Sequence, residues 1–391
     1  ENRIIYYESS RGCPFSCSYC LSSIDKCLRF REIELVKKEL QFFIDKKVPQ
    51  VKFVDRTFNC RHDHAMAIWT YIHEHDNGIT NFHFEVSADL LNEKEIALIN
   101  RMRPGLIQLE IGVQSANEIT IREINRTMKI DVLSTIVDKI KKGNNVHQHL
   151  DLIAGLPYEG YESFGKSFDR VYKMNPEQLQ LGFLKVLKGS VMHDRAQEYG
   201  IVYQDRAPYE VLSTKWLTYA EVIRLKQIEE MVEVYYNSGQ FCCTMAALEQ
   251  EFASPFCMYE CLAAYYDEKN AFAVSHSRIG RYEILYDFIV KTCKERSEQY
   301  MEMLTLDMYL RDNVKKRPEF LRESGVSSDE AAAFYKKEEK ERTYLKAYEG
   351  YDRRQMRKMT HLERIDGKTV LFDYKNRDPL TGNAAIYYLS E

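Results

Sequence analysis

The chain has 391 residues, of which 45% are hydrophobic and 29% charged, and these values exclude a disordered or collagen-like protein. Its 55 basic and 59 acidic side chains give a formal net charge of −4, so overall charge would not recruit nucleic acid or an anionic membrane. No stretch of about 18 consecutive apolar residues occurs, so the sequence predicts no transmembrane helix. At roughly 150 residues per domain, this length predicts two or three domains.

The ten cysteines fall into two groups, one in the first sixty residues and one in a later region. In a chain rich in Lys and Glu, grouped cysteines indicate a reducing, cytoplasmic compartment, where they bind metal more often than they pair. The chain begins at Glu1 without a Met, and we therefore expect a fragment of a longer protein. The members of the two groups are Cys13, Cys17, Cys20, Cys27 and Cys60, then Cys242, Cys243, Cys257, Cys261 and Cys293.

The first 200 residues alternate short apolar runs with amphipathic segments. Six strand-then-helix units predict an α/β domain with a parallel sheet and right-handed crossovers. Six units are too few for a closed eight-fold barrel, so we expect a partial (βα)6, TIM-like barrel. The predicted strands are 4–8, 50–54, 81–86, 106–112, 146–153 and 178–184, and the predicted helices are 32–47, 62–76, 93–103, 131–142 and 161–173.

From Pro208 onward the pattern becomes helical. We predict one long helix over 211–236, further helices to about residue 347, and a terminal β-hairpin formed by 369–374 and 384–389. The expected domains are therefore a barrel at 1–207 and a mostly α-helical C-terminal domain at 208–391.

The strongest chemical signal is the spacing Cys13-x3-Cys17-x2-Cys20 on the loop after the first predicted strand. Three such thiolates can bind three irons of a 4Fe–4S cluster and leave the fourth iron open to a substrate or cofactor. The loop also leaves the carboxyl end of a parallel strand, which is the active face of such barrels. The alternative is a closed zinc site with Cys27 as the fourth ligand.

With this motif, the chain resembles the radical SAM superfamily over roughly residues 1–200. The resemblance implies that S-adenosylmethionine (SAM) binds the open iron and is cleaved reductively to methionine and a 5′-deoxyadenosyl radical. It also implies a reductant such as a flavodoxin or ferredoxin. It names no substrate.

Four later residues are similar to the SAM-contacting residues of the branch that includes oxygen-independent coproporphyrinogen oxidase: Glu85, Gln114, Arg126 and Asp151. The fork of Arg126 suits the methionyl carboxylate. Glu85 and Asp151 can accept hydrogen bonds from ribose hydroxyls or the ammonium group, and Gln114 can donate and accept. Glu110 also interrupts an apolar strand and is either a further candidate or a buried structural partner.

Many relatives carry a Gly-Gly-Glu type run after the second strand to hold the SAM ammonium, and this chain has Asp55, Arg56 and Asn59 in that region. The run looks like that of cobalamin-binding radical SAM proteins. The group that binds the ammonium is therefore left open, and a backbone carbonyl in this loop is one candidate. Thr57 and Asn59 are alternatively caps of the next helix. Segment 184–190 and the region beyond Pro208 also resemble the cobalamin-binding group, which implies cobalamin and an N-terminal cobalamin domain in the intact protein.

Two rival interpretations stay open. One is a cobalamin-independent, coproporphyrinogen-oxidase-like enzyme, and the other is a zinc-stabilised scaffold that binds a partner. Among the later cysteines, Cys242, Cys243, Cys257 and Cys261 either hold a second cluster or pack as small hydrophobic residues, as the i,i+4 spacing of the last two favours. Of His147 and His149, we expect at most one to face the site and to be a candidate proton carrier.

Overall fold

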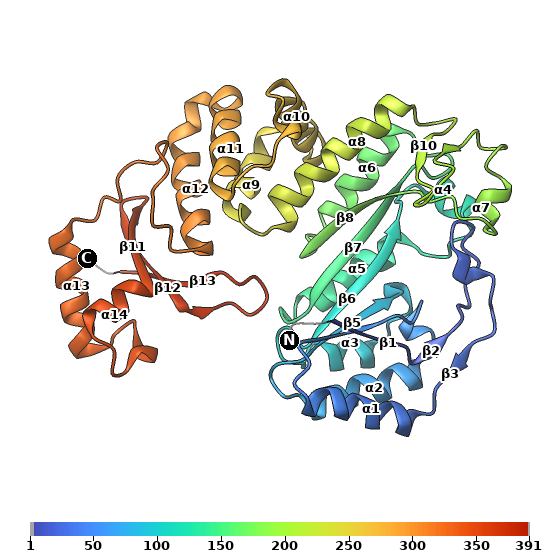
Figure 1. Ribbon diagram of the computed structural model, residues 1–391, viewed down its shortest axis with the longest axis horizontal. Coiled ribbons are helices and arrows are strands. Elements are labelled where there is room, and N and C mark those ends of the chain that lie inside the picture. The colour runs from blue at the N-terminus through green and yellow to red at the C-terminus, as the bar shows by residue number, and fades with distance from the viewer. Residues whose placement is uncertain (1–3, 390–391) are drawn as a thin grey trace. The chain divides into compact units, whose positions relative to one another are not determined.

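The computed structural model describes residues 4–389 and divides into two compact units (Figure 1). Among the described residues, the first unit runs to Val232 and includes Pro255–Cys257, and the second comprises Glu233–Ser254 and the chain from Met258. The sequence-based boundary at 207/208 lies within the first unit. None of the helices in the described part of the chain is long and apolar enough to cross a membrane.

A six-stranded parallel sheet organises the first unit, and its spatial order follows the chain. The six predicted strands are all present, and each crossover leads to the adjacent strand, as in a partial TIM-like barrel. The strands are β1 (Ile4–Tyr7), β4 (Gln50–Phe53), β5 (Asn81–Val86), β6 (Ile107–Gln114), β7 (His147–Ala154) and β8 (Gln178–Phe183).

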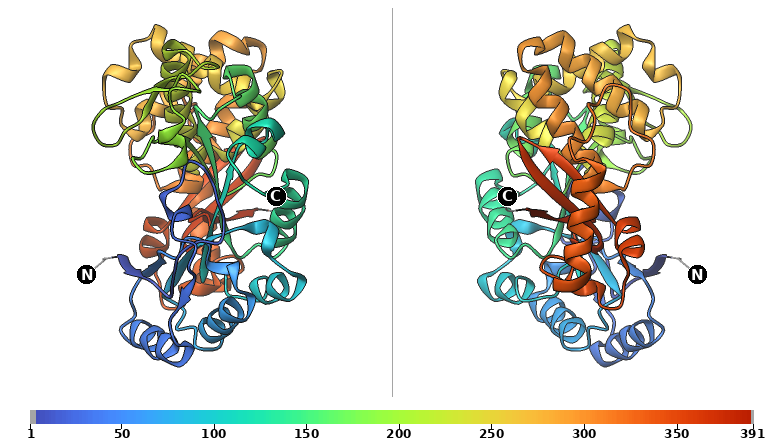
Figure 2. Two further views of the ribbon diagram at one scale, coloured as in Figure 1. Left: turned by 90° about the vertical axis from the view of Figure 1, so that its right-hand side faces the viewer. Right: turned by 90° about the vertical axis from the view of Figure 1, so that its left-hand side faces the viewer.

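Amphipathic helices cover the outer face of this sheet (Figure 1; Figure 2). Their apolar stripes are buried, as Val36, Leu40 and Ile44 show on the first helix. The predicted helices are confirmed as α1 (Ile33–Asp45), α2 (His62–Glu74), α3 (Glu93–Ile99), α5 (Ile130–Lys141) and α6 (Tyr161–Tyr172). The first unit also contains the short elements β2 (Ser10–Arg11), β3 (Arg29–Phe30), α4 (Glu118–Glu123) and α7 (Val191–Asp194).

The prediction of one helix over 211–236 is wrong at its start. Residues Val211–Ser213 form β10, which pairs with β9 (Val202–Tyr203), and helix α8 spans only Tyr219–Val232. A capping box explains the later start, because Thr218 Oγ1 accepts from the amide of Glu221 while the Glu221 carboxylate accepts from the amide of Thr218.

The second unit is mostly helical and ends in an antiparallel sheet. The predicted hairpin is confirmed as β12 (Lys368–Arg377) and β13 (Ala384–Tyr388), and a third strand, β11 (Thr360–Ile365), extends it. The two-residue turn Asp366–Gly367 joins β11 to β12 with positive φ at both positions. The helices are α9 (Cys242–Leu248), α10 (Pro255–Glu268), α11 (Arg278–Thr292), α12 (Ser297–Arg311), α13 (Ser328–Glu341) and α14 (Arg353–Lys358).

Candidate active site

A cavity of about 190 Å³ lies at the carboxyl ends of the parallel strands, between the loops after β1 and β4 and the strands β5, β6 and β7. The seven residues predicted as cluster ligands or SAM contacts come from five separate segments, and all of them line this cavity, as does the further candidate Glu110. The seven are Cys13, Cys17, Cys20, Glu85, Gln114, Arg126 and Asp151.

The cysteine loop is held in a tight path by its backbone. Gly12 has φ +96°, and a Cβ there would lie 2.5 Å from the carbonyl oxygen of Cys27, so the path requires glycine. The amide of Cys13 donates to the carbonyl of Asp25 at 3.2 Å. This fold buries Cys13 and Cys17 and leaves Cys27 exposed and outside the lining of the cavity.

Asp55 anchors the same loop from the end of β4. It is fully buried, and its carboxylate accepts from the Ser9 amide at 3.0 Å, the Ser9 hydroxyl at 2.7 Å and the Ser10 hydroxyl at 2.5 Å. Its acceptor capacity is thus used to join the first two loops of the sheet.

Asn59 performs a similar function one strand further on. Its side chain donates to the Ser87 carbonyl at 2.8 Å and accepts from the Ser87 amide at 2.9 Å, which ties the β4 loop to the β5 loop. The helix-cap hypothesis for Thr57 and Asn59 is therefore wrong, and α2 begins after Arg61 without a side-chain cap. Thr57 instead lines the cavity, with its hydroxyl 3.7 Å from the sulfur of Cys13.

Arg126 lies between the cysteine loop and the end of β6. Its Nη2 donates to the carbonyl of Gly112, while Nη1 donates to the Tyr19 hydroxyl at 3.3 Å and lies 4.0 Å from the Cys17 sulfur. The buried Nε of Arg126 has no partner among the described residues. The guanidinium is thus fixed beside the cavity with donor capacity to spare.

Gln114 has a backbone conformation that non-glycine residues rarely adopt, with φ +73°. Its buried Oε1 has no hydrogen-bond donor among the described residues. Gly112 makes room for this side chain, since a Cβ on Gly112 would lie 2.3 Å from Gln114 Nε2. Strained residues with free polar atoms are often found where a ligand binds.

A row of charged side chains crosses the sheet, and two of its members, Glu85 and Glu110, line the cavity. The parallel register places Glu85 beside Glu110 and Glu110 beside His149. Glu110 Oε2 lies 3.1 Å from Lys52 Nζ and 3.0 Å from His83 Nε2. The nearby His83 imidazole and the charge of Lys52, working against burial, lower the pKa of Glu110 to about 2. Glu110 is therefore an ionised carboxylate within this row.

The pKa values of the neighbouring carboxyl groups, Glu85 and Asp151, are shifted upward instead. Burial, reinforced by the charge of Glu110, raises the pKa of Glu85 to about 7. Burial also raises the pKa of Asp151, although His149 Nε2 lies 3.0 Å from Asp151 Oδ1 and lowers it in part. Two carboxyl groups that gain a proton easily therefore face the cavity.

We expected at most one of His147 and His149 to face the site, but alternation along the strand does not separate these two residues. Residues two apart on a strand point to the same side, so both imidazoles lie on one face of β7. Only His149 contacts a residue that lines the cavity, namely Asp151. Burial lowers the pKa of His147.

Within residues 4–389, no three Cys, His, Asp or Glu side chains converge closely enough to hold a single metal ion. The later cysteines within these described residues form no such group either. Cys242 Sγ donates to the Gly239 carbonyl at 3.2 Å, and burial raises the pKa of Cys243. A 4Fe–4S cluster does not require such convergence, because each thiolate binds a different iron.

Sequence comparison identifies the first unit. Residues 7–171 match the model of the radical SAM superfamily, so the first unit contains a radical SAM domain. Residues 197–379 match a second family, described as a protein of unknown function (DUF4080).

The relatives are similar over parts of their length. Oxygen-independent coproporphyrinogen III oxidase of Salmonella typhimurium is 29% identical over 107 residues, which is 26% of this chain and 23% of the oxidase. Bacteriochlorophyllide d C-12(1)-methyltransferase of Chlorobaculum tepidum is 25% identical over 178 residues, which is 44% of this chain and 37% of the methyltransferase. The chain therefore spans less than two fifths of either relative.

Among solved structures, a cobalamin-dependent S-adenosylmethionine radical enzyme, OxsB, with aqua-cobalamin and S-adenosylmethionine bound, is similar with a TM-score of 0.45 and 13% identity. That similarity covers 77% of this chain and 53% of OxsB.

Proposed function

We propose that this chain binds a 4Fe–4S cluster through Cys13, Cys17 and Cys20 and cleaves S-adenosylmethionine reductively. When bound, the cluster would supply one electron to the sulfonium of SAM. The observation that carries the proposal is the convergence of the three cysteines and four polar residues on one cavity. The electron donor is expected to be a flavodoxin or ferredoxin, in the cytoplasm.

The four polar residues are proposed to bind different groups of SAM. Arg126 offers its unused Nε–H beside the cysteine loop, where the methionyl carboxylate would lie. Asp151 and Glu85 face the cavity with carboxyl groups that can accept from ribose hydroxyls or balance positive charge. The buried Oε1 of Gln114 lacks a donor among the described residues, and a bound adenosine or ammonium N–H group would satisfy it.

The zinc-scaffold alternative requires Cys27 as a fourth metal ligand. A closed zinc site needs four ligands, whereas three are enough for a cluster with an open iron. Cys27 is exposed and does not line the cavity, although its carbonyl is in close contact with Gly12. This arrangement favours three thiolate ligands.

The test is iron retention after anaerobic reconstitution. Cys13→Ala, Cys17→Ala and Cys20→Ala should each fail to hold a 4Fe–4S cluster, and Cys27→Ala, the matched control, should hold it like the wild type. Equal loss of metal in Cys27→Ala and Cys17→Ala would support the four-cysteine zinc site and contradict the proposal.

We also propose that the barrel works beside a cobalamin-binding domain in the intact protein. The Asp55–Asn59 run supports this, and so does the edge strand β1, where Ile4 is 48% and Tyr6 67% exposed. The alternative is a cobalamin-independent, oxidase-like reaction. The similarity to the coproporphyrinogen oxidase supports this alternative. Product analysis distinguishes the two, because a methylated product that requires added cobalamin supports the first and an oxidised product without cobalamin supports the second.

A further inference from the structure

The second unit contains a cavity of about 520 Å³ that the radical SAM site does not use. It lies where four pieces of the unit meet, namely the start of α11, the loop after α12, the end of α14 and the end of β12. Its lining includes four cationic side chains and one carboxylate. These are Arg278, Lys315, Lys358 and Arg377, with Asp312.

The positive charge of this basic pocket is only partly neutralised. Asp312 forms an ion pair with Arg278, and its other oxygen lies 3.9 Å from Arg377 Nη2. Within residues 4–389, no carboxylate oxygen lies within 4.0 Å of the Nζ of Lys315 or Lys358. Four cations facing one anion leave three uncompensated positive charges, and such a concentration attracts an anionic ligand.

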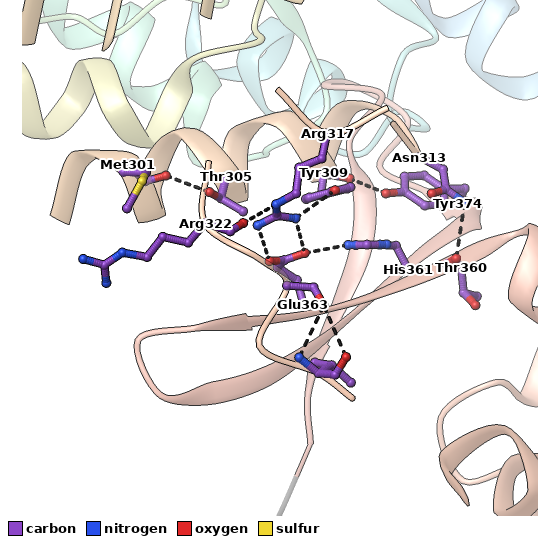
Figure 3. Close-up of polar contacts among 12 residues, drawn as sticks. Met301, Thr305, Tyr309, Asn313, Arg317, Arg322, Thr360, His361, Glu363 and Tyr374 are labelled. Atoms are coloured by element: carbon purple, nitrogen blue, oxygen red, sulfur yellow. Dashed lines mark hydrogen bonds and ion pairs between the residues drawn. The ribbon is translucent and has the colours of Figure 1, made fainter. Parts of the chain in front are cut away.

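Besides the Asp312 carboxylate, two carbonyl oxygens and an aromatic ring hold Arg377 in position. Its Nη1 donates to the carbonyls of Arg311 at 3.1 Å and Gly382 at 2.7 Å, and its guanidinium lies 5.4 Å from the ring centre of Tyr374. Tyr374 is fixed in turn, because its hydroxyl donates to the carbonyl of Tyr309 at 2.8 Å (Figure 3). Arg377 is therefore ordered in advance, which lowers the entropic cost of binding.

The loop that carries Lys315 is attached to β11 on both sides of that residue (Figure 3). On one side, Asn313 Nδ2 donates to the carbonyl of Thr360 at 3.3 Å. On the other side, Arg317 forms two hydrogen bonds, of 2.8 and 3.0 Å, with the carboxylate of Glu363, which is 1% exposed. A loop restrained at two points presents its lysine from a defined backbone position.

We propose that this basic pocket binds a phosphate-bearing ligand. A phosphate or phosphodiester group matches a site that combines two arginine forks with two lysine ammonium groups. The N-terminus of α11, a helix of 15 residues that begins at Arg278, adds partial positive charge on one wall. The proposal rests on the second unit alone and is independent of SAM chemistry at the first.

The test is calorimetric titration of the whole chain with inorganic pyrophosphate at low ionic strength. Saturable binding that weakens with added salt is expected, and Lys315→Gln combined with Lys358→Gln should weaken it by about 10-fold. The matched control is Lys336→Gln combined with Lys340→Gln, which removes two exposed lysines from α13 and should leave the affinity unchanged.

Two further titrations, with a nucleoside triphosphate and with single-stranded RNA, identify the kind of molecule that carries the phosphate. A nucleoside triphosphate that binds as tightly as pyrophosphate indicates a small phosphate ester, and affinity that rises with the length of a single-stranded RNA indicates a nucleic-acid backbone. Either result supports the proposal if the Lys315 and Lys358 variant weakens it. The absence of saturable binding by the wild type for every probe, or equal binding by the pocket and control variants, would overturn it.

Discussion

The titration of Glu85 makes the affinity for SAM depend on pH near neutrality. Burial and the neighbouring Glu110 raise the pKa of Glu85 to about 7, so this carboxyl is roughly half protonated at pH 7 before SAM binds. SAM carries positive charge, and it should therefore bind best to the ionised form. The ionised fraction rises about 10-fold between pH 6 and pH 8 for a group with this pKa, and the affinity should rise by the same factor.

The assay is calorimetric titration of reconstituted, unreduced protein with SAM at pH 6, 7 and 8. The wild type should release about half a proton per SAM bound at pH 7, which appears as a dependence of the measured heat on the buffer. Glu85→Gln should bind more weakly at pH 8 and should lose the 10-fold dependence, while Glu93→Gln, a change of an exposed carboxylate on α3, should keep it. An affinity for SAM that is flat from pH 6 to 8 in the wild type would refute the role given to Glu85.

The same shift has a consequence for folding in the absence of SAM. The folded pKa of Glu85 lies above its ordinary value of 4.5, so the protonated form is the one that the fold favours. Its contribution to stability is complete below the unfolded pKa and is lost as the pH rises through about 7. Thermal denaturation of wild type and Glu85→Gln should therefore diverge between pH 5 and 8, with the variant losing less stability. Parallel pH profiles would contradict this.

Three substitutions test other parts of the structure. Gly112→Ala should displace the Gln114 side chain, because the new Cβ would lie 2.3 Å from its Nε2, and should weaken SAM binding while iron content stays at the wild-type level; unchanged affinity would contradict this. Asp55→Ala removes the acceptor of three hydrogen bonds in a fully buried position and should lower the free energy of unfolding by about 3 kcal/mol, measured by urea denaturation. Glu363→Gln should cost about 2–3 kcal/mol by the same measurement, because Arg317 loses its charged partner at a nearly inaccessible site; a loss below about 0.5 kcal/mol would show that the pair is not coupled to folding.

The sequence predicts the barrel well because its elements depend on local patterns. All six strands are short apolar runs, and the five helices have buried stripes at helical spacing. The cysteine motif is equally local. No local pattern shows which thiol lies outside the site, because the exposure of Cys27 follows only from the fold of the loop around Gly12.

The wrong or missing predictions concern features that short sequence signals mark. The Asp366–Gly367 turn marks the hairpin that brings in β11, and Thr218 with Glu221 marks the start of α8. Residues two apart on a strand share a face, which would have placed His147 and His149 together.

The row of charged side chains across the sheet could not be predicted in the same way. Lys52 and His83 contact Glu110 from different strands, and these contacts depend on the register of β4, β5 and β6. A single sequence gives the order of such strands more readily than their register.

If the cavity binds a cluster and SAM together, the reduced protein should form 5′-deoxyadenosine. The chain, reconstituted anaerobically and supplied with dithionite and SAM, should form 5′-deoxyadenosine and methionine in equal amounts, even without a substrate. Cys17→Ala should form neither, and Cys27→Ala should form both. A wild-type protein that holds a complete 4Fe–4S cluster and binds SAM, yet releases no 5′-deoxyadenosine under reduction, would contradict the account.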